Sequence, residues 1–143
     1  MMMLALVLTV STTFAFKNKE VINKQAVNAL RSEFASATDV AWTVGKSYYK
    51  VAFTWDDQKL FAYYNNQGEF IAISRFISSS RLPLALQSSL KNLYRNYWIS
   101  DLFEMATNDV TDYYVTFENA DVKIVLKSTD GSNWSLYQKS KKA

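Results

Sequence analysis

Residues 48–55, Tyr-Tyr-Lys-Val-Ala-Phe-Thr-Trp, set the pattern from which the fold can be predicted. Tyr49, Val51, Phe53 and Trp55 fall on one side of an extended chain, which is typical of a β-strand with one buried face. Residues 112–118, Asp-Tyr-Tyr-Val-Thr-Phe-Glu, carry the same pattern in the second half of the chain. We therefore expect two matching strands in one antiparallel sheet.

The elements around these two strands recur in the same order. An apolar stripe at helical spacing precedes each strand, and Leu30 and Phe34 of the first stripe match Leu90 and Tyr94 of the second. A hairpin follows each strand and is closed by a turn that contains Gly68 or Gly131. The sequence thus predicts a tandem helix-plus-four-strand repeat, with halves at about 20–77 and 82–139.

The fold class that follows is α+β, with one antiparallel sheet of up to eight strands and both helices on one face. One helix is expected at about 20–37, and a second begins near Pro83 and buries a stripe that reaches Tyr97. The expected strands are 40–42, 48–55, 60–64, 69–77, 98–106, 112–118, 121–127 and 134–138.

The first hairpin is apolar on both faces, so its buried face has to be taken from the second hairpin. There, a turn with a glycine bulge at Gly131 pairs Leu126 with Trp134 and Ile124 with Leu136, all facing inward. Transfer of this register by the repeat gives two sets of residues. It places Phe61, Tyr63, Ile71 and Ile73 in the core and leaves Tyr64 and Phe70 on the open face.

The amino-acid composition excludes several classes of catalytic and metal-binding function. The 143 residues, 49% of them hydrophobic, suffice for one domain with a sizeable core. Histidine and cysteine are absent, which removes the base of Ser–His and Cys–His catalysis and the usual zinc ligands. A net charge of +3 does not require nucleic acid as a partner. We expect no cofactor, no metal and no enzymatic activity, and Asp56-Asp57 is expected to form a turn.

The N-terminal stretch predicts export. Residues 1–16 carry no charge, and Thr13 and Ala15 are small residues at the positions that precede a signal-peptide cleavage site. We expect residues 1–15 to be a signal peptide and residues 16–143 the mature domain. The apolar stretch is shorter than the roughly 20 residues that span a membrane. A periplasmic or secreted location follows.

Several segments in order resemble a known family. These are Phe34 to Trp42, Tyr48 to Phe53, Tyr63 to Glu69, and the Leu82-Pro83 start of the second helix. Together they are similar to the PepSY-like, or beta-lactamase-inhibitor-like, exported proteins of bacteria. The resemblance implies a concave sheet that, in the inhibitor that gives the family this label, grips a hydrolase. It implies no catalytic residues, and that inhibitor's two disulfides have no counterpart here.

The open face of the sheet is the predicted binding site, because tyrosine and phenylalanine on an exposed sheet are typical of contact surfaces. We expect it to contact an envelope or extracellular protein or peptide. The alternative function is a small-ligand or lipid carrier with a pocket between sheet and helices. The residues expected to form the partner-binding face are Tyr48, Lys50, Tyr64, Phe70, Tyr114, Lys123 and Tyr137.

Overall fold

The structure, a computed structural model, describes residues 21–143. Its strands form one eight-stranded antiparallel sheet in which each strand pairs with the next along the chain. The strands are β1 (Thr38–Val44), β2 (Tyr48–Trp55), β3 (Gln58–Asn65), β4 (Phe70–Phe76), β5 (Trp98–Ala106), β6 (Thr111–Glu118), β7 (Val122–Ser128) and β8 (Ser135–Lys141). Helix α2 (Lys24–Glu33) precedes β1, and the short helix η1 (Ser79–Arg81) and helix α3 (Leu84–Leu90) precede β5.

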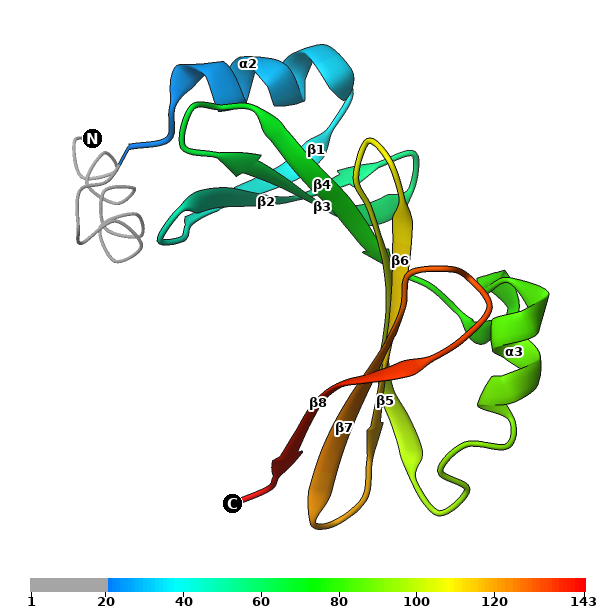
Figure 1. Cartoon of the computed structure of the whole chain (residues 1–143). Helices are drawn as coiled ribbons and strands as arrows, with labels where there is room; N and C mark the ends of the chain where they lie inside the picture. Colours follow the sequence, from blue (N-terminus) through cyan, green and yellow to red (C-terminus); the bar gives the residue numbers. More distant parts are fainter. Residues whose placement is uncertain (1–20) are drawn as a thin grey trace, which may run out of the picture.

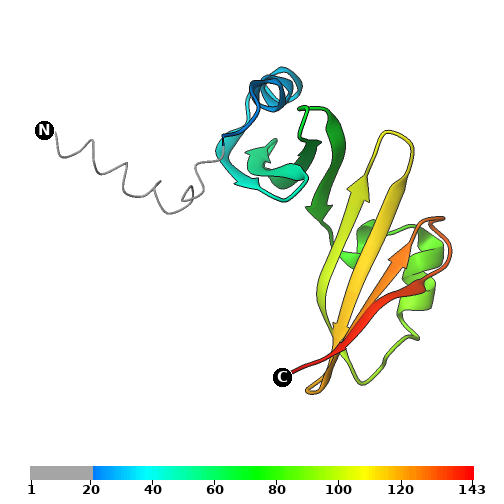
Figure 2. The same ribbon diagram turned by 60° about the vertical axis from the view of Figure 1, so that its left-hand side comes forward.

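The single antiparallel sheet with two helices is confirmed, and both helices lie on one face of it. Val51 pairs with Ala62, Ala62 pairs with Ile73, and Ile73 pairs with Ala106, so one face runs unbroken from β2 to β5. Figure 1 shows α2 and α3 on the outer side of the bent sheet, and Figure 2 shows the two groups of strands meeting at an angle. The opposite, concave face carries no helix.

Each half of the sheet has its own buried cluster beneath its helix. The first consists of Ala26, Leu30, Val51, Phe53, Leu60, Ala62 and Tyr64. The second consists of Leu82, Leu86, Leu90, Leu102, Val115, Phe117, Ile124 and Leu126. Trp42, Trp55 and Trp134 pack half-buried at the margins of these clusters, as the sequence predicted for Trp55 and Trp134. Burial of such side chains contributes about 1.5–3 kcal/mol each to stability.

Helix α2 is held by its cap and by a close approach of the β3–β4 loop. Asn23 Oδ1 accepts a hydrogen bond from the Gln25 amide at 2.7 Å, and Asn23 Nδ2 donates to the Asn66 carbonyl at 3.1 Å. Gly68 has a φ of +87°, and a Cβ there would lie 2.7 Å from the Ala26 backbone nitrogen. Glycine is therefore required for this loop to rest against the first turn of α2.

The phase of β3 contradicts the sequence-based prediction. Phe61 and Tyr63 lie on the open side and not in the core, because Ala62 and its neighbours two residues away face α2. The prediction aligned the hairpins on Gly68 and Gly131, but the loop between β3 and β4 is one residue out of step with the loop between β7 and β8. A slip of one residue turns every side chain of a strand to the other face.

The same correction applies to Tyr64 at the end of β3 and to the start of β4. Tyr64, expected on the open face, is only 2% exposed, and the Phe70 ring packs beside it on the helix side at 6.2 Å. Ile71 is the extra residue of a bulge opposite Tyr63 and Tyr64 and is exposed, so its predicted burial is wrong. Ile73 packs against the first cluster as predicted.

The last hairpin departs from its predicted register. Leu126 pairs with Leu136 instead of Trp134, and Ile124 pairs with Lys139. Leu136 was predicted to face inward but is 61% exposed. All residues of the edge strand β8 are exposed. Strand β8 also extends to Lys141.

The second helix is shorter than its apolar stripe suggests. The helix ends at Leu90, and Tyr94 has a positive φ of 45°. Leu93, Tyr94 and Tyr97 nevertheless pack against the second cluster. The stripe therefore predicted the buried side chains correctly but not their backbone conformation.

The expected signal peptide, residues 1–15, lies outside the residues that the structure describes. Within residues 21–143, neither helix has the length and apolar character needed to cross a membrane.

Candidate binding surface

Aromatic rings cross the open face of the sheet from β2 to β8, in one pair and one chain of five that meet at Lys50. We call these rings the aromatic band, and its members are Tyr48, Tyr63, Phe61, Phe76, Phe103, Tyr114 and Tyr137. Strand pairing brings them to one face, since Phe76 lies opposite Phe103 and Phe103 lies opposite Tyr114. The aromatic band therefore joins the two halves of the molecule on the side without helices.

Ring-to-ring contacts hold the aromatic band together. Phe103 and Tyr114 are stacked with centroids 4.8 Å apart, and Phe76 meets Phe61 and Phe103 edge-on at 5.8 and 6.3 Å. Such pairs each contribute about 0.5–1.5 kcal/mol beyond their buried area. Phe76 and Tyr137 still remain 59% and 58% exposed. The rings thus contact one another while two of them keep more than half of their surface exposed.

Two lysines lie over rings of the aromatic band. Lys50 Nζ is 4.9 Å from the centroid of Phe61 and 5.8 Å from that of Tyr63. Lys127 Nζ lies 5.5 Å from the centroid of Tyr114 and 5.7 Å from that of Tyr137. Cations placed in this way are attracted to the negative face of the ring. The surface is therefore apolar in its area and positive at two points.

The lysine in the second half has an acidic neighbour. Lys127 Nζ lies 3.5 Å from Asp112 Oδ2. The Tyr114 hydroxyl and the Asp112 carboxylate raise the pKa of Lys127 above its ordinary value. The charge of Lys127 is thus balanced within the sheet by Asp112.

A third lysine, Lys142, lies beside Glu118 and Trp98 at the β5–β6 end of the open face. Lys142 Nζ lies 2.8 Å from Glu118 Oε1 and 4.9 Å from the centroid of the Trp98 ring. Its hydrogen bond, with a second one from Ser100, lowers the pKa of Glu118. Of the C-terminal lysines, Lys142 is therefore paired, and Lys139 and Lys141 belong to β8.

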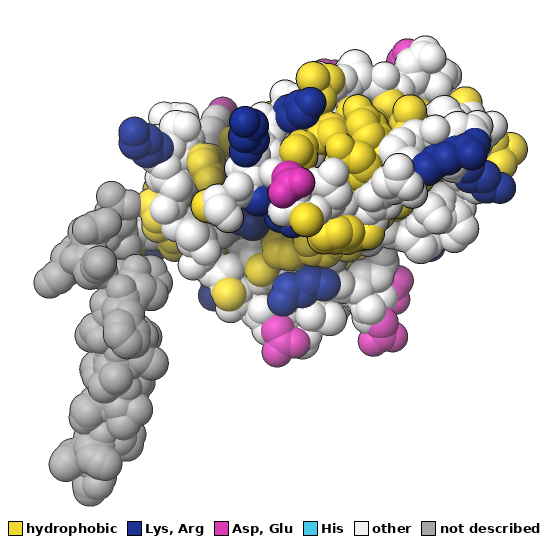
Figure 3. Space-filling view, turned by 90° about the horizontal axis from the view of Figure 1, so that it is seen from below, with side chains coloured by type: hydrophobic (Ala, Val, Ile, Leu, Met, Phe, Trp, Pro, Cys, Tyr) yellow, Lys and Arg dark blue, Asp and Glu magenta, His cyan; other side chains and the backbone are white. Residues whose placement is uncertain are grey.

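The aromatic band contains a pocket of about 210 Å³ near its centre. Its walls include Lys50 and Tyr63 on one side and Asp101 on the other. Phe61, Phe76 and Phe103 supply most of its apolar lining. Seen from below in Figure 3, hydrophobic side chains gather around a hollow, with basic and acidic side chains beside it.

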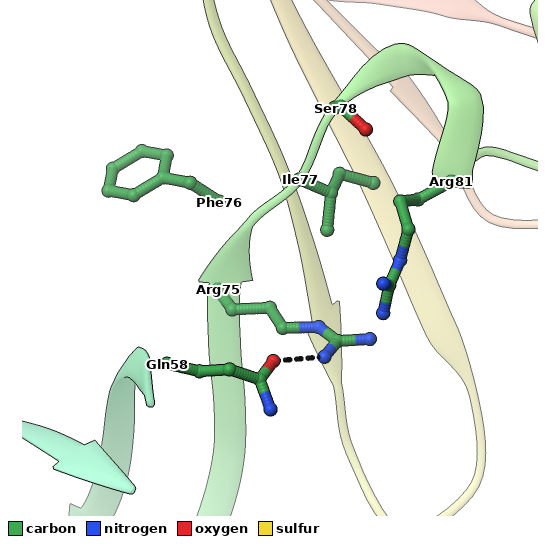
Figure 4. A pocket seen from close by; sticks show the side chains of 6 residues that line it. All are labelled: Gln58, Arg75, Phe76, Ile77, Ser78 and Arg81. Atoms are coloured by element: carbon green, nitrogen blue, oxygen red, sulfur yellow. Dashed lines mark hydrogen bonds between the residues drawn. The ribbon is translucent and has the colours of Figure 1, made fainter. Parts of the chain in front are cut away.

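Two further pockets lie where the halves of the sheet meet on the helix side. One of about 210 Å³ is lined by Phe34, Trp55 and Ile73, and one of about 170 Å³ by Gln58 and Arg81. Arg75 lines both and donates to Glu104 Oε2 at 2.7 Å and to Gln58 Oε1. Figure 4 shows Arg75 pointing toward Gln58 while Phe76 points away to the other side. Both spaces fall below the roughly 300 Å³ at which small-molecule pockets begin.

The structure divides the seven residues that the sequence placed on the binding face. Five of them project from the open side, namely Tyr48, Lys50, Tyr114, Lys123 and Tyr137. Tyr64 belongs to the first core, where desolvation and the Glu33 carboxylate raise its pKa to about 12. Phe70 sits beside Tyr64 at the margin of that core.

Sequence reasoning missed four of the rings in the aromatic band. Phe61 and Tyr63 had been assigned to the core, and Phe76 and Phe103 had no assigned face. The signal that finds the first two is the match between β2 and β6, continued into β3 and β7 across turns that preserve the register. That match aligns Leu60 and Ala62 with the buried Ile124 and Leu126.

Side chains that could perform metal chemistry do not gather anywhere in residues 21–143, where no group of three or more Asp or Glu side chains could hold an ion. Asp56 and Asp57 form the β2–β3 turn, with φ values of 53° and 61°. The arrangement that the described residues do offer is a concave surface lined by aromatic rings and suited to contact.

Comparison with solved structures places the fold among known ones. A BLIP-like protein from Bacteroides fragilis superposes with a TM-score of 0.70 at 18% identity, covering 85% of this chain and 87% of that one. A DUF2874 family protein from Bacteroides ovatus gives 0.74 at 16% identity, with coverages of 85% and 89%. A protein from Bacteroides eggerthii, predicted to be periplasmic, gives 0.74 at 12% identity, with coverages of 85% and 90%.

These likenesses establish a BLIP-like fold for this chain. No protein-family model matches the sequence, and no curated protein matches it either. At such identities the solved structures support the architecture alone, so the function has to be argued from the surface itself.

Proposed function

We propose that this protein is an exported, non-catalytic binding module that contacts another protein or a peptide through its aromatic band, in the manner of an inhibitor. The observation that carries the proposal is the exposure of the aromatic band on the face without helices. Aromatic side chains supply much of the binding energy at protein interfaces, since they bury large areas at low entropic cost. A contiguous apolar patch of this kind is typical of an interaction site.

Three finer assignments belong to the same proposal. The halves at about 20–77 and 82–139 are taken as a tandem repeat, and each consists of a helix followed by four strands. Membership of the PepSY-like group rests on the sequence resemblance. A periplasmic or secreted location rests on the apolar N-terminal stretch, and the eggerthii structure with the same fold is also predicted to be periplasmic.

The experiment compares a variant of the aromatic band with a control variant on the helix side. Phe76→Ser with Tyr137→Ser removes the two most exposed rings of the aromatic band, and Leu84→Ser removes an 80% exposed apolar side chain on the helix side. Immobilised wild type and variants are exposed to envelope extract, and the captured proteins are compared. The double variant should lose the captured protein while Leu84→Ser retains it.

Circular dichroism of the double variant checks that folding is intact, because both side chains are largely exposed. Equal capture by the double variant and the wild type would contradict the proposal. Loss of capture by Leu84→Ser alone would move the binding surface to the helix side.

The alternative function, a small-ligand or lipid carrier, has two supporting observations. A pocket of about 420 Å³ beside the start of α2 is lined by Val21, Val44 and Tyr49. The pocket lined by Phe34, Trp55 and Ile73 lies on the helix side of the sheet, as such a carrier requires. Its volume of about 210 Å³ holds a fragment and not a lipid chain. Native mass spectrometry of purified protein decides the matter, since a carrier would retain a small molecule and the binding module would not.

A further inference from the structure

The pocket in the aromatic band has a charge on each of two walls. Lys50 comes from β2 and Asp101 from β5, and the rings of Phe61, Phe76 and Phe103 lie among them. Neither Lys50 nor Asp101 takes part in an ion pair within residues 21–143. Both are half-buried, so their charges act through a partly apolar surrounding where electrostatic attraction is stronger than in water.

Two carboxylates on the open face are already matched within the protein. Asp112 pairs with Lys127, and Glu118 pairs with Lys142. The contrast is closest between Lys50 and Lys127, because each lies over two rings of the aromatic band. In the match between β2 and β6, Tyr48 corresponds to Asp112 and Lys50 corresponds to Tyr114. Asp112 therefore pairs with Lys127, whereas Tyr48 offers no carboxylate to Lys50.

The remaining charged residue at this pocket is turned away from it. Arg75 lines the pocket, but its guanidinium group binds Glu104 and Gln58 on the helix side of the sheet. Figure 4 shows this guanidinium group on the opposite side of the strand from Phe76. The pocket is therefore dipolar, with Lys50 as its positive wall and Asp101 as its negative wall.

We propose that this pocket binds an extended segment of another protein that carries a carboxylate and a cation on either side of a bulky apolar side chain. The segment's Asp or Glu pairs with Lys50, its Lys or Arg pairs with Asp101, and the apolar side chain fills the space between the phenylalanines. The inference rests on the proposed function and gives the partner of that surface a chemical identity.

Size and charge both favour this occupant. A space of about 210 Å³ is smaller than pockets for whole drug-sized ligands but suits one large side chain. Interface hot spots are commonly such pockets, in which one anchor side chain is surrounded by contacts that exclude water. Charge complementarity on both sides of the anchor fixes its direction and rejects segments of the wrong polarity.

The test uses a random peptide library displayed on phage and selected on immobilised full-length domain. Wild type should enrich peptides with an acidic and a basic residue flanking Phe, Trp, Tyr, Leu or Met. Lys50→Met should lose the acidic preference and keep the basic one. Asp101→Asn should show the reverse. Lys91→Met and Asp121→Asn, both exposed and distant from the pocket, should select the same peptides as wild type.

One enriched peptide, labelled with a fluorophore, then gives the magnitude by anisotropy. Its dissociation constant should rise roughly three- to tenfold for Lys50→Met and for Asp101→Asn, as expected for partly exposed charge pairs. Lys50→Arg should restore the acidic preference, because it returns the positive charge. This rescue separates a charge effect from a general loss of folding.

Three results would overturn the inference. They are a selection by wild type that yields no peptide, enriched peptides without paired charges, and the same charge preference in Lys50→Met and Asp101→Asn as in wild type. The proposed function fails separately. If Phe76→Ser with Tyr137→Ser selects the same peptides as wild type, the open face is not the binding surface.

Discussion

The two halves of the sheet reach similar packing by different local means. In the first half, Gly68 lets the β3–β4 loop touch the backbone of α2, and Asn23 ties the helix to that loop. In the second half, Trp134 replaces the close contact by donating its indole N–H to the Leu86 carbonyl at 3.3 Å. A Cβ added at Gly131 would meet Pro83 Cγ at 3.8 Å, which is an ordinary van der Waals contact and not a clash. Backbone contact in one half is thus replaced by a side-chain bridge in the other.

The difference shows which features a helix-on-sheet unit needs. Both halves require two leucine or alanine anchors on the helix and a buried phenylalanine on the central strand, Phe53 or Phe117. The loop that supports the helix can vary. Substitutions at matched positions should therefore have equal effects in the cores and unequal effects in the loops.

The largest effect is expected in the cores. Phe53 and Phe117 are both buried, so Phe53→Ala and Phe117→Ala should each lower the free energy of unfolding by about 3–5 kcal/mol. Urea denaturation of both variants measures this. A cost below about 1 kcal/mol for one of them would mean that its cluster is not a true core.

The loops should separate the halves most clearly. Gly68→Ala brings a Cβ within 2.7 Å of backbone at a positive φ and should cost roughly 2–5 kcal/mol. Gly131→Ala has the same backbone strain without the clash and should cost about 1–2 kcal/mol. The two variants are compared by thermal and urea unfolding. Equal losses would show that the contact between the Gly68 loop and α2 does not support the helix.

Alkaline pH should act on the first half through Tyr64. Burial raises its pKa from 10.0 to about 12, so the folded state favours the neutral phenol. The stabilisation is complete below pH 10 and is lost as pH rises through 12, amounting to roughly 2 kcal/mol. Tyr64→Phe should remove this part of the pH dependence in unfolding measured between pH 9 and 12. An unchanged alkaline slope in Tyr64→Phe would place the hydroxyl in water.

Acidic pH should act weakly on the second half through Asp130. The Ser132 and Asn133 amides donate to its carboxylate and lower its pKa from 3.8 to about 2. Its contribution is present above pH 3.8 and is lost as pH falls through 2. Asn65, which accepts from the Gln67 and Glu69 amides in the first half, has no such titration. Asp130→Asn should flatten the acid limb of stability slightly, and a steeper limb in the variant would contradict this.

Much of the architecture could be predicted because alternation and helical spacing are local signals. Residues 48–55 and 98–106 coincide with β2 and β5, and the number of strands and the helix-covered face were also correct. The phase of β3 could not be read locally, since Phe61, Tyr63, Leu60 and Tyr64 are all apolar or aromatic. Only the pairing across a register-preserving turn decides between the two faces.

The sequence predicted that the open face would carry aromatic side chains, but it did not identify all of the residues that form the aromatic band. Tyr48, Tyr114 and Tyr137 alternate with clearly buried residues, so their exposure follows from strand geometry. The path from Phe61 through Phe76 and Phe103 depends on how β4 pairs with β5, which joins residues from different halves. Likewise, the opposition of Lys50 and Asp101 arises only when four strands are set side by side.

The most direct test of the binding surface is an aromatic carbon-13 NMR titration with the captured partner or an enriched peptide. Signals of Phe76, Phe103 and Tyr114 should shift on binding, while those of Phe34 and Trp55 on the helix side stay in place. Shifts confined to Phe34 and Trp55, with the rings of the aromatic band unmoved, would contradict the assignment of binding to the concave face.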